Sequence, residues 1–236
     1  THGQRSISYG LLQQSLSHFA GGLINLGMQR GERIGIYLEK RLETVVASFG
    51  SAAAGCVFVP LNPLLKADQV AHIMRDCNVR ALVTSSERLS LLAPILASCH
   101  DLRQVILVNT DHLPSGDGPL AYLHWDDLLQ AGIRSGHRVI DTDMAAILYT
   151  SGSTGKPKGV VLSHRNIVAG AISVASYLEN SAEDTLLAAL PLSFDAGFSQ
   201  LTTAFHAGAR VVLLNYLLPQ DVLKALAAEK VTGLTA

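Results

Sequence analysis

The chain has 236 residues, of which 37 are charged (18 Lys and Arg, 19 Asp and Glu). This is 16% of the residues, against about 25% in ordinary soluble domains. The length predicts one large domain or two small ones, and the 48% of apolar residues excludes intrinsic disorder. A net charge of −1 leaves no basic surface for nucleic acid, so we expect no nucleic-acid partner. The low charge density fits either a membrane segment or one part of a larger protein.

One uncharged stretch, Thr44–Leu65, is long enough to cross a bilayer. It changes character midway, because a run of small residues that favours a helix gives way to the strand-like Val57–Val59, which Pro60 ends. We therefore interpret it as a buried helix followed by a buried strand, and we expect no transmembrane segment. The chain opens with neither an apolar secretory signal nor an initiator Met, so we expect a cytoplasmic protein with further residues upstream.

Cysteine usage and histidine spacing argue against disulfides and metal centres. Cys56, Cys77 and Cys99 lie 21 and 22 residues apart, with no C-x-x-C pair. An odd number of cysteines without a pattern is typical of buried thiols in a reducing compartment. The nine histidines form no H-E-x-x-H motif and no Cys/His cluster, so we predict that this chain itself binds no metal.

Apolar periodicity predicts helices and strands that alternate over short links. The first helix, about Ser8–Gly27, has one apolar stripe at steps of three and four residues, with Ser8 as its N-cap. Further helices are expected at Thr44–Ala54, Asp68–Cys77 and Ser86–Ser98, from about Ser163, and at Gly197–His206 and Gln220–Lys230. Strands are expected at Arg33–Leu38, Val57–Val59, Ala81–Val83, Val105–Val108, Ala145–Tyr149, Gly159–Leu162, Thr185–Leu190, Arg210–Asn215 and Val231–Ala236. This alternation is typical of βαβ units, so we predict an α/β fold with mainly parallel sheets covered by helices.

A long segment rich in Pro, Gly and Asp, Asn109–Leu120, interrupts this alternation. It is either a surface excursion within one domain or the seam between two subdomains, near residues 109–141. Within it, Gly116–Ala121 loosely matches a dinucleotide-binding fingerprint, but no strand precedes the match and Pro119 blocks the glycine turn. We treat that match as chance.

The segment with the most informative chemistry is Tyr149–Gly159, YTSGSTGKPKG, between two apolar strands. Its glycines let the backbone approach a ligand, and successive N–H groups can form an anion-binding nest. Four Ser and Thr hydroxyls add hydrogen-bond donors, and Lys156 and Lys158 add positive charge. These groups suit a polyphosphate, whereas a flexible surface hairpin is the plain alternative.

Two known motifs fail in this segment. A Walker A loop needs G-x-x-x-x-G-K-[ST], but Pro157 follows Lys156, Thr150 stands where the first glycine belongs, and a strand rather than a helix follows. A G-x-S-x-G nucleophile elbow fails because Ser151 stands where its first glycine belongs. The sequence therefore disfavours a P-loop NTPase.

The stretch Ile147–Lys158 resembles, at every position, the phosphate-loop signature of the adenylate-forming superfamily, and Gly159–Asn166 continues the pattern. That superfamily includes acyl-CoA synthetases, coumarate ligases, luciferases and the adenylation domains of nonribosomal peptide synthetases. Further stretches in family order are Ser8-Tyr9, Gly31–Ile34, Ala54-Gly55 to Leu61–Pro63, and Pro191–Asp195. The overall likeness also points to kinship with the acyl-CoA ligases associated with exosortase gene clusters.

The resemblance implies an enzyme that joins a carboxylic acid to ATP and passes the acyl group from the acyl-adenylate to a thiol. That thiol would belong to CoA or to the phosphopantetheine of an acyl carrier protein. Catalysis would depend on positioning and charge neutralisation at the α-phosphorus. The match assigns catalytic roles to Lys158, the family's fixed position, and to Thr154. The phosphate-binding residues that it implies are Thr150, Ser151, Gly152, Ser153, Thr154, Gly155, Lys156 and Lys158.

The motif Ser193–Asp195 concerns the acid to be activated. Many fatty and aromatic acid ligases of the superfamily have His where Phe194 stands, as a gate between acyl pocket and adenylate, whereas Phe is usual in amino-acid-activating domains. In those domains the aspartate that matches Asp195 pairs with the substrate's α-ammonium group. The resemblance therefore implies Phe194 and Asp195 as substrate residues and an amino acid as an alternative substrate class. Equally, Asp195 fits an N-cap for a helix that begins near Ala196.

Several later motifs of the superfamily do not occur in this sequence. They are the Gly-Thr-Glu motif that holds adenine and Mg²⁺, the ribose-binding Asp, the hinge, and the small C-terminal domain with its catalytic lysine. We therefore expect residues 1–236 to be the N-terminal part of the large adenylation domain, inactive alone and with the magnesium ligand outside it. The alternative from another class is a nucleotide- or acyl-binding module without turnover.

Overall fold

Helices and strands alternate along the computed structural model, which describes residues 1–114, 118–150 and 157–235. The strands are β1 (Arg33–Tyr37), β2 (Val57–Pro60), β3 (Val79–Ser85), β4 (Gln104–Val108), β5 (Ala121–His124), β6 (Met144–Thr150), β7 (Lys158–Ser163), β8 (Thr185–Ala188), β9 (Arg210–Leu213) and β10 (Gly233–Leu234). The helices are α1 (Tyr9–Asn25), α2 (Leu42–Ala54), α3 (Ala67–Asp76), α4 (Ser86–Leu96), α5 (Trp125–Gln130), α6 (His164–Tyr177), α7 (Asp195–Ala207) and α8 (Pro219–Ala228).

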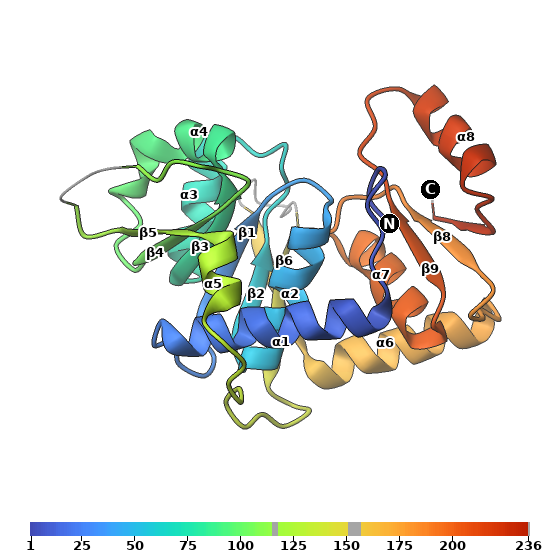
Figure 1. Cartoon of the computed structure of the whole chain (residues 1–236), viewed down its shortest axis with the longest axis horizontal. Coiled ribbons are helices and arrows are strands. Elements are labelled where there is room, and N and C mark those ends of the chain that lie inside the picture. Colours follow the sequence, from blue (N-terminus) through green and yellow to red (C-terminus); the bar gives the residue numbers. More distant parts are fainter. Residues whose placement is uncertain (115–117, 151–156, 236) are drawn as a thin grey trace.

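The strands form two sheets that lie side by side (Figure 1). The larger sheet occupies the left and centre of the view and has the order β5-β4-β3-β1-β2-β6-β7, while the smaller one, at the right, has the order β10-β8-β9. Strand pairs in both sheets are parallel except for the antiparallel hairpin β6–β7. The predicted α/β class, with mainly parallel sheets covered by helices, is confirmed.

Local sequence accounts for several of the helix ends. Ser8 is the N-cap of α1, and its hydroxyl accepts a hydrogen bond of 3.2 Å from the backbone N–H of Leu11. Gly55 ends α2 with a φ of 84°, a left-handed conformation that costs glycine little. The strand β2 follows at once, so the interpretation of Thr44–Leu65 as a helix and a buried strand is confirmed. In the described part of the chain, no helix combines the length and the apolar character that a membrane span requires.

Five strands differ from the prediction by two residues or more at an end, and two of these, β8 and β9, each end two residues earlier than expected. Strand β5 was not expected, since its four residues are exposed or half-buried, and it forms by pairing with the edge strand β4. Strand β3 extends beyond the expected Ala81–Val83, because its polar residues Thr84 and Ser85 are also buried. Strand β10 has two residues where six were expected. For β3 and β5 the pairing with β4, and not the local pattern, sets the extent of the strand.

An aromatic cluster joins the two sheets. The ring of Phe198, on α7 beside the smaller sheet, lies 5.4 Å from the ring of Phe49 on α2 and 5.1 Å from that of Phe58 on β2, between centroids. The ring of Phe205, also on α7, lies 5.3 Å from the ring of Phe49, between centroids. The Phe198 side chain is only 3% exposed. This cluster therefore carries much of the apolar contact between the α7 layer and the larger sheet.

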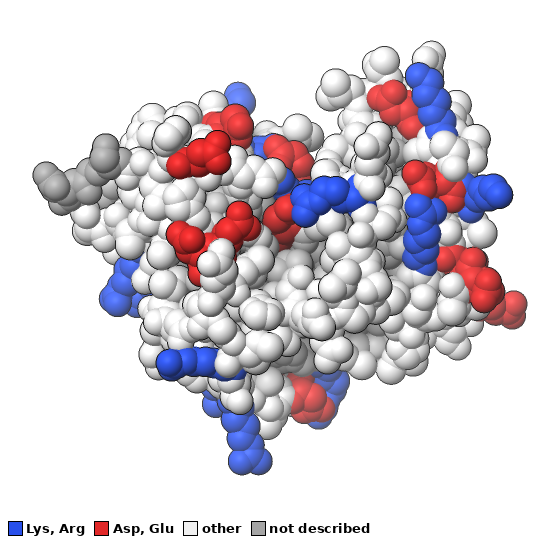
Figure 2. Space-filling model, viewed as in Figure 1, with Lys and Arg blue, Asp and Glu red and all other residues white. Residues whose placement is uncertain are grey.

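The covered sheet explains the low charge of the chain. Strands β1, β2 and β4 are buried over nearly their whole length, which requires apolar residues on both faces. Helix α1, which crosses the front of the molecule in Figure 1, contains no charged residue, and the corresponding surface is largely uncharged in Figure 2. Two-sided burial thus accounts for the apolar strands, and the uncharged outer face of α1 lowers the charge density further.

The three cysteines, Cys56, Cys77 and Cys99, are free and buried, as predicted. Burial raises the pKa of the Cys56 thiol to about 12 and also raises the pKa of Cys77 and Cys99. Such thiols are protonated at neutral pH and react slowly. Among the described residues, no group of three or more His, Cys, Asp or Glu side chains is placed to hold a metal ion.

Replacing Phe198 by Ala should lower the free energy of unfolding by about 3–5 kcal/mol, because the cluster between the sheets then contains a cavity. Urea denaturation followed by fluorescence or circular dichroism measures this change. Tyr177→Ala on α6 is the matched control, since that ring is 69% exposed and its loss should change stability by less than about 0.5 kcal/mol. Equal losses for both variants would contradict the assigned role of the cluster.

Candidate functional site

The two ends of the phosphate-loop segment meet at the carboxyl end of β6. In the hairpin β6–β7, Thr150 pairs with Lys158 and Tyr149 pairs with Gly159. Both Thr150 and Lys158 are exposed. The residues between them that the sequence assigned to phosphate binding lie outside the described residues, and these are Ser151, Gly152, Ser153, Thr154, Gly155 and Lys156. Their roles, including the catalytic role of Thr154, stay predictions.

Tyr149 anchors the strand that leads into this loop. Its hydroxyl donates a hydrogen bond to the carboxylate of Asp76, the last residue of α3. The Sγ of Cys77 lies 3.0 Å from the hydroxyl oxygen of Tyr149. Because the phenolic proton is donated to Asp76, the Cys77 thiol is the donor in this second contact. Burial, together with these two hydrogen bonds, raises the pKa of Tyr149, so the phenol stays protonated. A Cβ at Gly159 would lie 3.2 Å from the Tyr149 ring, so glycine there makes room for it.

A cavity of about 310 Å³ opens beside the loop ends. We call it the acid-site cavity. Its walls come from the carboxyl ends of β2 and β6, from α3 and from the segment before α7, which is where open parallel sheets place ligand crevices. It is lined by Pro60, Asn62, Leu65, Gln69, Ile73, Tyr149, Thr150, Pro157, Ser193 and Phe194. The fold thus brings together Thr150 and Phe194, which the sequence assigned to phosphate and acid respectively.

Phe194 and Asp195 have different surroundings. Helix α7 begins at Asp195, and Phe194 is its N-cap, without a side-chain capping bond. The expectation that Asp195 caps a helix beginning near Ala196 is therefore wrong, because Asp195 is already the first helical residue. Its carboxylate is exposed in the first turn, where the helix dipole favours a negative charge. Phe194 contributes to the wall of the acid-site cavity.

Ser193 and Asn62 also line the cavity, and sequence reasoning assigned no role to either. Ser193 is buried, and its Oγ has no hydrogen-bond partner among the described residues. An unsatisfied buried hydroxyl costs about 1–3 kcal/mol, so this oxygen is suited to a polar group of a ligand. Both residues lie in stretches that carry the family resemblance, which was the one signal available in the sequence.

Close backbone packing holds the segment before α7. A Cβ at Gly197 would lie 1.9 Å from the carbonyl oxygen of Pro191, so no other residue fits without moving the backbone. The first turn of α7 therefore packs directly on Pro191, and Phe194 N–H donates to the same carbonyl oxygen at 3.3 Å. These contacts position Ser193 and Phe194 against the acid-site cavity.

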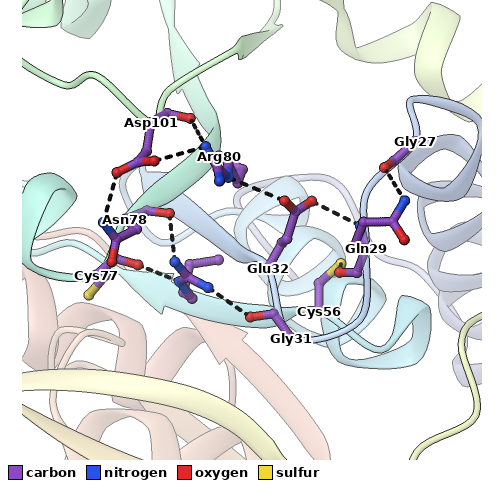
Figure 3. Close-up of polar contacts among 10 residues, drawn as sticks. Gly27, Gln29, Gly31, Glu32, Cys56, Cys77, Asn78, Arg80 and Asp101 are labelled. Atoms are coloured by element: carbon purple, nitrogen blue, oxygen red, sulfur yellow. Dashed lines mark hydrogen bonds and ion pairs between the residues drawn. The ribbon is translucent and has the colours of Figure 1, made fainter.

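A polar network at the opposite, amino end of the larger sheet has a different character (Figure 3). Arg80 pairs with Glu32 at 3.2 Å and with Asp101 at 2.9 Å, and Asn78 donates to Asp101 at 2.7 Å. The guanidinium of Arg33 donates to three backbone carbonyls of the neighbouring turns. Each charge in this network has a partner, so we assign it to holding the turns before β1 and β3.

The geometry agrees with the comparison to known families. The chain belongs to the AMP-binding enzyme family, whose model matches residues 1–236. The resemblance to the adenylate-forming superfamily is thereby confirmed.

Two relatives illustrate the range of this family. The chain is 31% identical over 227 residues to gramicidin S synthase 2 of Brevibacillus brevis, which is 96% of this chain and 4% of that protein. It is 32% identical over 195 residues to the peroxisomal long chain acyl-CoA synthetase 7 of Arabidopsis thaliana, which is 79% of this chain and 28% of that protein. The chain thus spans less than a third of either relative.

Solved structures confirm the fold. The anthranilate CoA ligase AuaEII, in complex with anthranoyl-AMP, superposes with a TM-score of 0.89 at 24% sequence identity. The superposition covers 99% of this chain and 45% of the ligase chain. At this identity the likeness concerns the fold alone.

Replacing Tyr149 by Phe should lower the free energy of unfolding by about 1.5–3 kcal/mol, because the Asp76 carboxylate and the Cys77 thiol lose their partner. Denaturant unfolding measures the difference. Tyr177→Phe removes the same oxygen from an exposed ring and should leave stability unchanged within about 0.5 kcal/mol. A Tyr149→Phe variant as stable as the control would show that this contact does not anchor β6.

Proposed function

We propose that the complete protein activates a carboxylic acid with ATP and transfers the acyl group to a thiol, that of CoA or of carrier-protein phosphopantetheine. In the first step a carboxylate oxygen attacks the α-phosphorus of ATP, and pyrophosphate leaves. In the second step the thiol sulfur attacks the acyl carbon, its proton is lost, and AMP leaves. The observation that carries the proposal is the acid-site cavity, which joins Thr150, at the edge of the phosphate loop, to Phe194.

In this proposal the loop residues neutralise and hold the phosphates, through hydroxyls, backbone N–H groups and the ammonium groups of Lys156 and Lys158. Lys158 is exposed beside Thr150, so its side chain is free to reach a phosphate at the carboxyl end of β6. Thr154 and Lys158 are the proposed catalytic residues. Mg²⁺ would neutralise phosphate charge when bound, and its ligands are expected outside this chain.

The chain contributes only part of the proposed enzyme. We propose that residues 1–236 form the N-terminal part of the large adenylation domain, and the partial coverage of the solved ligase chain supports this. A cytoplasmic location is also proposed, and the free, buried thiols support it, since they are typical of a reducing compartment. The alternative of a nucleotide- or acyl-binding module predicts ATP binding without pyrophosphate exchange for any acid.

The class of acid divides into two candidates, amino acids and plain fatty or aromatic acids. The exposed carboxylate of Asp195 favours an amino acid, because it follows Phe194 directly and can form a charge-assisted bond with an ammonium group. The relatives named above include a gramicidin synthase and an acyl-CoA synthetase, in agreement with either class.

Replacing Lys158 by Ala in the complete protein should reduce carboxylate-dependent ATP–pyrophosphate exchange by about 10²-fold or more, because a charge that stabilises the transition state is lost. Lys224→Ala removes an exposed ammonium from α8 and should leave the exchange rate unchanged. Unchanged exchange in Lys158→Ala would contradict the catalytic assignment.

Asp195→Ala tests the substrate class. If the acid is an amino acid, its KM should rise by about 10²-fold, since the loss of a hydrogen-bonded charge partner costs about 2–5 kcal/mol. A hydroxamate screen across fatty, aromatic and amino acids identifies the preferred acid, and Glu183→Ala removes another exposed carboxylate as the control. A preference for plain fatty acids, with Asp195→Ala fully active, would exclude the amino-acid proposal.

A further inference from the structure

A buried lysine lies where the two sheets meet. Lys40 comes three residues after β1, and only 9% of its surface is exposed. Its Nζ donates to the carbonyl oxygen of Ala189 at 2.6 Å, and the carbonyl oxygen of Leu190 lies at 3.4 Å. Ala189 directly follows β8. One side chain therefore connects the carboxyl end of the larger sheet to the carboxyl end of the smaller one.

The backbone of Lys40 is held just as closely. Its N–H donates to Oδ1 of Asn215 at 3.1 Å, and Nδ2 of Asn215 donates back to its carbonyl oxygen at 2.7 Å. Asn215 lies two residues after β9, and the ring of the next residue, Tyr216, lies 5.9 Å from Nζ. Lys40 is thus fixed to the segments that follow both β8 and β9.

Lys40 also lines a second cavity, of about 440 Å³, that adjoins the acid-site cavity. The two cavities share Pro60, Asn62 and Ser193 as lining residues. The ionisable groups in the second cavity, besides Lys40, are Tyr216 and the pair formed by Glu39 and Arg88 at 2.9 Å. Within the described part of the chain Lys40 forms no ion pair of its own.

This arrangement costs stability at neutral pH. Burial lowers the pKa of Lys40 from its ordinary value of 10.5 to about 8. Because the folded-state pKa is the lower one, the unfolded chain binds more protons between these values, and the contribution of Lys40 to stability rises as pH rises from about 8 to 10.5. An apolar side chain would avoid this cost, so packing alone does not explain an ammonium group here. Side chains whose pKa is strongly shifted concentrate at functional sites.

We propose that Lys40 is a positioning residue for the acid site, holding Ala189 and Leu190 so that Ser193 and Phe194 face the acid-site cavity. The inference rests on the proposed function. The segment from Ala189 to Phe194 is held at its start by the Lys40 ammonium and further along by the contact of Gly197 with Pro191. Releasing the first of these contacts lets the wall of the acid site shift, while the strand β6 that leads to the phosphate loop keeps its own anchor at Tyr149.

Lys40→Met in the complete protein tests this role through steady-state kinetics of pyrophosphate release. We expect KM for the preferred acid to rise about tenfold, since a lost charge-assisted hydrogen bond changes an equilibrium by about that factor, and KM for ATP to change less than twofold. Lys40→Arg should restore most of the acid affinity, because a guanidinium also donates to carbonyls. Lys224→Met, an exposed lysine on α8, is the matched control.

Hydrogen exchange provides a readout that does not depend on activity. In Lys40→Met, the amides of Ala189, Leu192 and Phe194 should exchange about tenfold faster, while those of the remote strands β3 and β4 keep their rates. If Lys40→Met does not fold, Asn215→Ala is the second variant. It keeps the ammonium group and removes the two hydrogen bonds to the Lys40 backbone. We expect a smaller rise of KM for the acid and an unchanged KM for ATP.

The outcomes separate the two proposals. A complete wild-type protein with no carboxylate-dependent ATP–pyrophosphate exchange would overturn the proposed function. With an active wild type, a Lys40→Met variant that keeps both KM values, or that raises both equally, would overturn the positioning role alone. Unchanged hydrogen exchange at the amides of Ala189, Leu192 and Phe194 would overturn it as well.

Discussion

Parallel strand pairing is the constraint on which the rest of this molecule depends. A parallel sheet needs crossover helices on both faces, so its strands are buried on both sides and must be apolar. This requirement accounts for the low charge density and for the uncharged stretch Thr44–Leu65, which supplies one crossover helix and one strand. It also places the carboxyl ends of β1, β2 and β3 at one edge, while the paired charges around Arg80 occupy the other.

The candidate site is built across the meeting of two sheets. In the larger sheet, β6 supplies Thr150 and the segment after β2 supplies Asn62, while the segment after the smaller sheet's β8 supplies Ser193 and Phe194. Its geometry therefore depends on what joins the sheets. The aromatic cluster around Phe198 provides apolar contact between them, and its strength comes from buried area, which has little directional preference.

The polar contacts at this boundary fix the relative orientation of the two sheets, which apolar packing alone does not. A hydrogen bond weakens steeply with poor angle and distance, so the bonds from Lys40 to Ala189 and between Lys40 and Asn215 restrict how one sheet lies on the other. Three residues far apart in the chain, each just beyond a strand end, make this connection. Nothing in the local sequence around any of them marks it.

What the sequence determined by itself is the set of elements and the chemistry of one loop, because periodicity, caps and the phosphate-loop signature are local. The sequence alone predicts most of the helices and strands, the N-cap Ser8 and the α/β class. The tertiary structure alone decided the pairing of β5 with β4 and the contacts of Tyr149 and Lys40, because each depends on partners distant in the chain. A residue's own neighbours in sequence carry no record of such partners, so a buried lysine and an exposed one look alike until the chain is folded.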